Sequence, residues 1–249
     1  MRIFWQPIYT FWVIVSFTIC FLMIVPVVVL VSLPNRPSSR KRIYHILKFS
    51  AGFWLMLIGI FTKKSGTLPA KTQRYVIVAN HISYMDAVAI FLISPNYFRP
   101  LGKIEMARIP VFGFVYKQIV LLVDRSSAHN RARSMRLMWR ALRRECSILL
   151  FPEGTFNETE APLLPFHDGA FRLAIHAQTP LLPVLLPDMV NRWHYSHWWK
   201  MSPGKNRIIY LPAIQTEGLQ IEQMPELKKQ VAELMSRELK NLGYPKNVV

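Results

Sequence analysis

Residues 74–86 read RYVIVANHISYMD, an apolar run that leads to the first acidic residue of the chain. The β-branched and apolar start of this stretch predicts a buried strand, and the apolar residues 87–93 that follow it predict a helix. Ser83 with Asp86 three positions later forms a variant of the capping box, so we expect the helix to begin near Ser83. His81 and Asp86 then lie at a strand-to-helix junction, where the carboxylate can reach back to the imidazole.

A histidine and a carboxylate in this arrangement are suited to acid–base catalysis. A carboxylate that accepts a hydrogen bond from one nitrogen of a neutral imidazole fixes its tautomer and leaves the other nitrogen free to take a proton from a hydroxyl. We interpret His81 as a general base and Asp86 as its orienting group. The alternative is a surface histidine beside a helix cap. A metal site is disfavoured, because one His and one carboxylate fall short of the three protein ligands of catalytic zinc sites.

A second predicted strand also ends at a turn that carries a lone acid, in residues 147–155, SILLFPEGT. Together, N-H-x-x-x-x-D and F-P-E-G-T, in this order and at this separation, resemble the motifs of the glycerolipid acyltransferases, most closely the bacterial 1-acylglycerol-3-phosphate acyltransferases. Residues 103–106, 109–113 and 122–125 are similar to the second block of that family, and Pro183-Val184 resembles the fourth. The resemblance covers roughly residues 70–190.

The resemblance implies a reaction. A fatty acyl group would pass from acyl-CoA or acyl carrier protein to the free hydroxyl of lysophosphatidic acid, giving phosphatidic acid in phospholipid synthesis. The thioester is a co-substrate, and no cofactor is implied. No G-x-S-x-G motif is present to form an acyl-enzyme, so direct attack by the acceptor hydroxyl, with His81 as the base, is favoured.

Further residues are candidates for substrate binding. Lys103 and Arg125 are expected to bind the acceptor phosphate, although each taken singly is more often an ordinary surface cation. Glu153 is expected to hold the hydroxyls of the acceptor. Gly154 and Thr155 are expected to offer backbone N–H groups to the developing oxyanion.

One departure from the family pattern leaves the acceptor open. The family commonly carries Arg directly after E-G-T and a basic residue before the glycine at position 169, whereas this chain has Phe156 and His167-Asp168. Glycerol 3-phosphate or a lyso-aminolipid is therefore an alternative acceptor. A non-catalytic membrane adaptor that gathers anionic lipid is a third interpretation, against which the intact His81, Asp86 and Glu153 argue.

The N-terminal segment is a candidate membrane anchor. Residues 3–35 carry no charge, and residues 9–33 are apolar over more than the about 20 residues of a membrane helix. A signal peptide is disfavoured, because the apolar stretch is too long and no small-residue cleavage site precedes the basic cluster at residues 36–42. The shorter apolar stretch at residues 49–61 is typical of an interfacial helix.

Basic residues precede, separate and follow the two apolar stretches, which favours a hairpin with all its basic sites on one side of the membrane. We predict a monotopic two-helix membrane hairpin over residues 1–65 and an acyltransferase domain over residues 66–249. A single span by the first helix is the alternative. Cys20 and Cys146 are not expected to form a disulfide, which fits a domain on the cytoplasmic side of the inner membrane.

The net charge of +17 predicts an anionic partner. Anionic lipid headgroups fit better than nucleic acid, because the chain has a lipid-phase segment and no recognisable nucleic-acid-binding signature. Five arginines recur at helical spacing on a predicted helix over residues 127–145: Arg133, Arg136, Arg140, Arg143 and Arg144. They form either a solvated face or a face toward the membrane or the CoA phosphates.

The order of predicted elements indicates an α/β fold, with a largely parallel sheet flanked by helices, as in the glycerolipid acyltransferases. Strands are expected at residues 74–79, 120–124, 147–151, 181–186 and 207–213. Helices are expected at residues 84–94, 127–145, 168–177 and 225–243. In such sheets, ligands bind beyond the carboxyl ends of the strands, where His81, Arg125 and Glu153 all fall.

Overall fold

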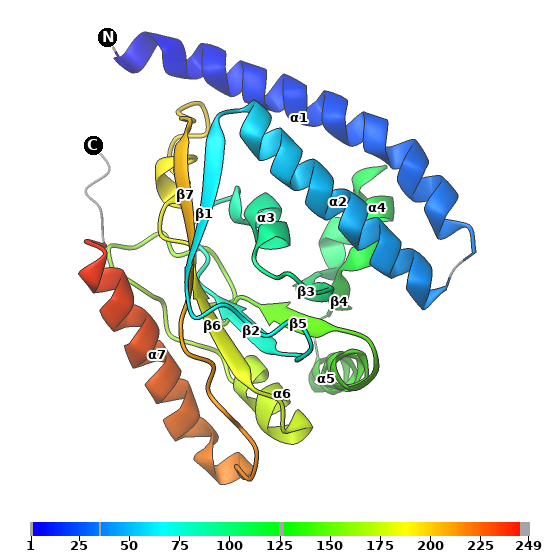
Figure 1. Cartoon of the computed structure of the whole chain (residues 1–249), viewed down its shortest axis with the longest axis vertical. Helices are drawn as coiled ribbons and strands as arrows, with labels where there is room; N and C mark the ends of the chain where they lie inside the picture. The colour runs from blue at the N-terminus through cyan, green and yellow to red at the C-terminus, as the bar shows by residue number, and fades with distance from the viewer. Residues whose placement is uncertain (1, 35, 125–126, 245–249) are drawn as a thin grey trace.

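One mostly parallel sheet organises the molecule (Figure 1). The computed structural model describes residues 2–34, 36–124 and 127–244. Within these ranges seven strands pair in the order β1-β7-β6-β2-β5-β3-β4. They are β1 Ile60–Gly66, β2 Val76–Ala79, β3 Phe98–Lys103, β4 Leu121–Val123, β5 Ser147–Leu150, β6 Leu181–Leu185 and β7 Gly204–Tyr210. All neighbouring pairs are parallel except β6 and β7, so the predicted α/β class is confirmed.

Helices cover both faces of the sheet. They are α1 Arg2–Ser32, α2 Pro37–Leu57, α3 Asp86–Ala89, α4 Phe112–Ile119, α5 Ala128–Arg144, α6 Gly169–Ala177 and α7 Met224–Asn241. α5, α6 and α7 contact β5, β2 and β6, respectively. Figure 1 shows these three helices below the central strands and α2 with α3 above them. Both faces of the central strands are thereby removed from water.

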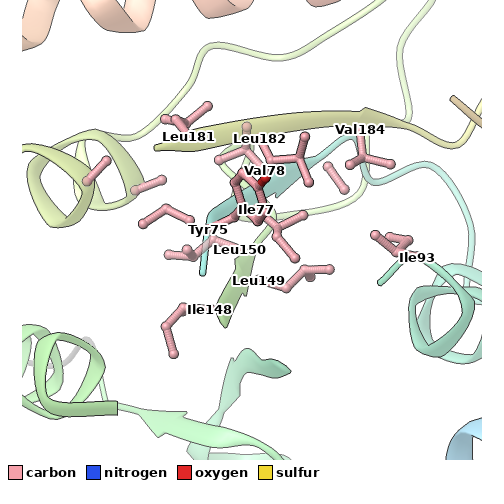
Figure 2. Packing of buried hydrophobic residues seen from close by; sticks show 14 of the residues in the cluster. Tyr75, Ile77, Val78, Ile93, Ile148, Leu149, Leu150, Leu181, Leu182 and Val184 are labelled. Atoms are coloured by element: carbon pink, nitrogen blue, oxygen red, sulfur yellow. The ribbon is translucent and has the colours of Figure 1, made fainter. Parts of the chain in front are cut away.

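The central strands β2, β5 and β6 are apolar along their whole length because of this double cover. Every residue in the three strands is buried. Ile77 is aligned with Leu149 on one side and with Leu182 on the other, and Figure 2 shows the three side chains in one cluster. Truncating such a side chain to alanine costs about 2 to 5 kcal/mol. This cluster fixes the strand ends from which the candidate site projects.

Two strands, β1 and β3, lie outside the set predicted from the sequence. β1 reads IFTKKSG and pairs with β7 along its full length. β3 reads FRPLGK, which contains the Pro and Gly that are uncommon in strands. The sheet begins at Ile60, so the predicted division after residue 65 falls inside β1. The reason is the pairing with β7, a partner that local sequence does not reveal.

The predicted helix over residues 84–94 starts later than expected and is split. α3 begins at Asp86, and a 3-10 turn over Ile90–Leu92 follows it. The hydroxyl of Ser83 accepts the N–H of Met85 at 3.2 Å and donates to the carbonyl of Trp193 at 2.8 Å. The carboxylate half of the predicted capping box is present, since Asp86 Oδ2 accepts the N–H of Ser83 at 2.9 Å.

α1 and α2 form a hairpin at one end of the molecule (Figure 1). The ring N–H of Trp54 donates to the hydroxyl of Ser16 at 3.2 Å. Among the described residues, α1 is the one helix long and apolar enough to cross a membrane, over Trp5–Ser32, with a mean hydropathy of 3.0. Large apolar side chains are exposed along it: Ile8, Phe11, Trp12, Ile14, Ile19, Leu22, Met23 and Leu30. The apolar stretch 49–61 is divided between α2 and β1.

The arginine stripe lies on α5, and all five of its side chains are exposed. The opposite side of α5 contributes Met138 and Leu142 to the core. Both cysteines are free, Cys20 half-buried and Cys146 buried. That the two cysteines form no disulfide stays a prediction.

Candidate active site

Asp86 occupies the first position of α3 and is fully buried. Its Oδ2 lies 3.0 Å from Nδ1 of His81 and accepts the backbone N–H groups of Ile82 at 2.8 Å and Ser83 at 2.9 Å. An ionised carboxylate is an acceptor only, so Nδ1 carries the proton and Nε2 is left as the basic nitrogen. The predicted contact between imidazole and carboxylate is therefore present.

The imidazole of His81 is packed between aromatic rings. The ring of Phe151 stacks on it at a centroid distance of 3.9 Å and an interplanar angle of 11°. The ring of Phe156 lies at 4.1 Å and 44°. The side chain of His81 keeps 17% of its surface exposed. Phe156, which stands where the family commonly has Arg, is thus a neighbour of the candidate base.

The turn after β5 holds the backbone of His81. The N–H of His81 donates to Oε1 of Glu153 at 2.9 Å, and the N–H of Asn157 donates to the carbonyl of His81 at 2.8 Å. Oε2 of Glu153 accepts the N–H of Leu164 at 2.8 Å. Burial raises the pKa of the Glu153 carboxyl to about 7. Both oxygens face the protein, so we revise the expected contact of Glu153 with acceptor hydroxyls to a role in positioning His81.

Gly154 closes this turn. It adopts φ +73°, a left-handed conformation that glycine adopts without a steric cost. Its N–H donates to the carbonyl of Phe151 at 3.1 Å, so in this geometry it is not free to bind an oxyanion. Thr155 next to it is exposed. The expected oxyanion contact of Thr155 stays a prediction.

The two predicted phosphate-binding cations are Lys103 and Arg125. Lys103 ends β3 and is exposed. β3 lies two strands from β2, about 10 Å across the sheet, and its carboxyl end points to the same edge. Arg125 lies outside the described residues. The structure thus brings His81, Asp86 and Glu153 together and places Lys103 along the same edge.

Two asparagines contribute to the site without having been predicted. Asn80 is fully buried and joins the ends of β2 and β6: its side chain accepts the N–H of Leu186 at 2.7 Å and donates to the carbonyl of Leu186 at 3.3 Å. Asn157 is fully buried beside the carbonyl of His81. A signal was available for Asn80 alone, since a polar residue directly after a buried strand must find a partner for its amide.

No three His, Cys, Asp or Glu side chains gather to form a metal-binding group in the ranges that the structure describes. The absence of a metal from the reaction stays a prediction.

Comparisons with known proteins agree with this geometry. A family model described as acyltransferase matches residues 59–186. The chain is 30% identical over 166 residues to 1-acyl-sn-glycerol-3-phosphate acyltransferase alpha from Mus musculus, covering 66% of this chain and 58% of the mouse protein. It is 31% identical over 173 residues to an uncharacterized acyltransferase from Schizosaccharomyces pombe, covering 68% of this chain and 61% of that protein. The chain thus spans less than two thirds of the length of these curated relatives.

A solved structure is similar in fold. It is the crystal structure of the 1-acyl-sn-glycerophosphate acyltransferase PlsC from Thermotoga maritima. The two structures agree with a TM-score of 0.81 over 98% of each chain, at 21% sequence identity. The likeness includes the N-terminal hairpin, because the match covers almost the whole chain.

Proposed function

Because the chain belongs to the acyltransferase family, we propose that it transfers a fatty acyl group from a thioester to the free hydroxyl of lysophosphatidic acid, giving phosphatidic acid. The observation that carries the proposal is the 3.0 Å contact between His81 and Asp86. The acceptor class rests on relatives named 1-acyl-sn-glycerol-3-phosphate acyltransferase, from mouse and from Limnanthes douglasii. The donor is acyl-CoA or acyl carrier protein, and we expect no cofactor.

His81 would act as the general base in a direct transfer. Nε2 takes the proton of the acceptor hydroxyl while the hydroxyl oxygen attacks the thioester carbonyl carbon. The C–S bond then breaks, and the proton passes from the imidazolium to the departing thiolate. Asp86 holds Nδ1 and stabilises the imidazolium through the same hydrogen bond.

The acceptor phosphate requires cations at the same edge of the sheet. Lys103 and Arg125 are the proposed ligands, and exposure of Lys103 fits this role. Phe156 gives the turn after β5 no cation of its own at that position. The acceptor is therefore left open, and in a second candidate function the same transfer serves glycerol 3-phosphate or a lyso-aminolipid.

The test is a thiol-release assay on purified chain in detergent, with acyl-CoA or acyl carrier protein as donor. The acceptors are lysophosphatidic acid, glycerol 3-phosphate, lysophosphatidylethanolamine and none. We expect release that depends on lysophosphatidic acid, with phosphatidic acid found by mass spectrometry. Release with a different acceptor would favour the second candidate. Absence of release with every acceptor and both donors would leave the non-catalytic adaptor as the better interpretation.

We also propose that α1 and α2 anchor the domain in one leaflet of the cytoplasmic membrane, with the active site facing the cytoplasm. The exposed apolar side chains of α1 and the packing of α1 along α2 support a hairpin over a separate span. Membrane fractions washed in high salt should retain the chain, and detergent should release it. Release by salt alone would mean that the basic surface, and not the hairpin, holds the protein.

A further inference from the structure

The structure points to a function for Phe156 that the family pattern does not supply. A ring stacked at 3.9 Å, as Phe151 is, covers one face of the imidazole of His81. A second ring with its centroid only 4.1 Å from the imidazole centroid has room against the opposite face alone. His81 is therefore held between Phe151 and Phe156, with its edge toward Asp86.

Phe156 contacts one further ring, that of Tyr84, which in turn contacts Trp193. Tyr84 contacts Phe156 at a centroid distance of 4.8 Å and an interplanar angle of 63°, and Tyr84 contacts Trp193 at 5.3 Å and 48°. Trp193 is tied to the β2–α3 turn, because its carbonyl accepts the hydroxyl of Ser83 at 2.8 Å. The half-buried ring of Phe156 thus contacts Tyr84 as well as the imidazole.

The hydrogen bond to Asp86 alone does not define the direction of Nε2. One bond at Nδ1 leaves the imidazole free to tilt about the line that joins the two groups. Contact with a ring on each face removes this freedom and keeps water from both faces. A base that must meet a hydroxyl at hydrogen-bonding distance gains from this, since a misplacement of about 1 Å can cost about 100-fold in rate.

We propose that Phe156 is a positioning residue that, with Phe151, clamps the imidazole of His81 and directs Nε2 to the acceptor hydroxyl. The inference rests on the proposed function for its kinetic consequence but not for the clamp itself. At position 156 this chain therefore has a residue that acts on the base, in place of a phosphate-binding cation.

The test compares Phe156→Leu and Phe156→Tyr with the matched control Phe91→Leu, a half-buried ring away from the site in contact with Tyr44. Phe156→Leu should lower kcat about 10- to 100-fold with little change in the KM of the acceptor. Phe156→Tyr should restore most of the activity, because it returns the ring. Phe91→Leu should stay near wild type. A raised acceptor KM at unchanged kcat would overturn the proposal and make Phe156 an acceptor contact.

A second readout needs no substrate. Diethyl pyrocarbonate labels imidazoles, and peptide mass spectrometry resolves His81 from the exposed His129. Phe156→Leu should speed labelling of His81 several-fold relative to His129, and Phe156→Tyr should not. Unchanged labelling of His81 overturns the clamp whether or not acyl transfer is found. Faster labelling at unchanged kcat would show that the clamp does not serve catalysis, which overturns the positioning role.

Discussion

The turn after β2 and the turn after β5 each bury one carboxylate, but they use it differently. Asp86 takes three hydrogen bonds on one oxygen, all from residues 81–83. Glu153 takes one on each oxygen, from residues 72 and 11 positions away in sequence. The first carboxylate orients the imidazole within its own turn, and the second ties the backbone that carries the imidazole to another part of the sheet. Orientation and placement of His81 thus come from separate regions.

The two carboxylates also differ in electrostatic environment. Burial raises the pKa of Glu153 to about 7, and its partners are neutral backbone N–H groups. Asp86 is paired with the one group in the site that can become a cation during the reaction. We therefore expect changes to Asp86 to affect mainly the chemical step and changes to Glu153 to affect mainly the folding stability.

The largest effect on activity is expected from removing the imidazole of His81, which both turns position. His81→Ala should lower kcat about 10²- to 10⁴-fold, because a positioned general base contributes that much to rate. The backbone bonds of residue 81 to Glu153 and Asn157 remain, so the variant should stay folded, although the loss of the partner of Asp86 should lower its thermal stability. Steady-state thiol release and circular dichroism on the same preparation check both statements. Turnover near wild type would remove His81 from the mechanism.

Asp86→Asn isolates the turn after β2. The amide keeps the shape but can donate to Nδ1, which favours the wrong tautomer of the imidazole. We expect kcat to fall about 10²- to 10³-fold, less than for His81→Ala. The acceptor KM should change little. An Asn variant as active as wild type would reduce Asp86 to a helix cap.

Glu153→Gln isolates the turn after β5, and its signature is pH dependence of stability. The unfolded carboxyl ionises near its ordinary value of 4.5, while the folded one holds its proton up to about pH 7. Raising the pH through this window therefore favours the unfolded state, and the free energy of unfolding falls by about 3 kcal/mol. Chemical unfolding in detergent at pH 4.5, 6 and 8 measures it. The stability of wild type relative to E153Q should fall across this range, and a constant difference would contradict the burial argument.

The smallest effect on activity is expected for the predicted phosphate-binding cations, which lie outside both turns. Lys103→Ala should raise the acceptor KM about 10- to 100-fold, since a charge-assisted bond to phosphate contributes about 1.5 to 3 kcal/mol, and leave kcat nearly unchanged. Arg125→Ala should act in the same way. Lys117→Ala, an exposed lysine on α4, is the control. If the KM of acyl-CoA rises instead, these cations bind the donor.

The same two turns show what the sequence could predict. The contact between His81 and Asp86 was predictable because the geometry of one strand-to-helix junction sets it. The contact between Glu153 and His81 depends on the pairing of β2 with β5, for which no local signal exists. The clamp by Phe156 was missed for the same reason.

The strands, too, could be predicted only where the local sequence carries a signal. β2, β5 and β6 were predicted because burial on both faces makes them apolar throughout. β1 was missed because its exposed lysines do not alternate with buried apolar residues. β3 was missed because Pro100 and Gly102 interrupt its pattern. Its Arg99 is buried and donates to the carbonyls of Ile119 and Val120. No local sequence motif predicts these two contacts, because their partners lie about 20 residues away in the chain.

The pairing of β1 with β7 has a consequence for the order in which the chain folds during synthesis. Residues 67–203 must be made after β1 before its partner strand exists. At about 5 to 20 residues per second, this takes about 7 to 30 s. During this time the partner strand of β1 is absent. Lys63 and Lys64 on β1 are exposed charges of the kind that oppose edge-to-edge aggregation. The sheet is therefore completed only after β7 has been synthesised.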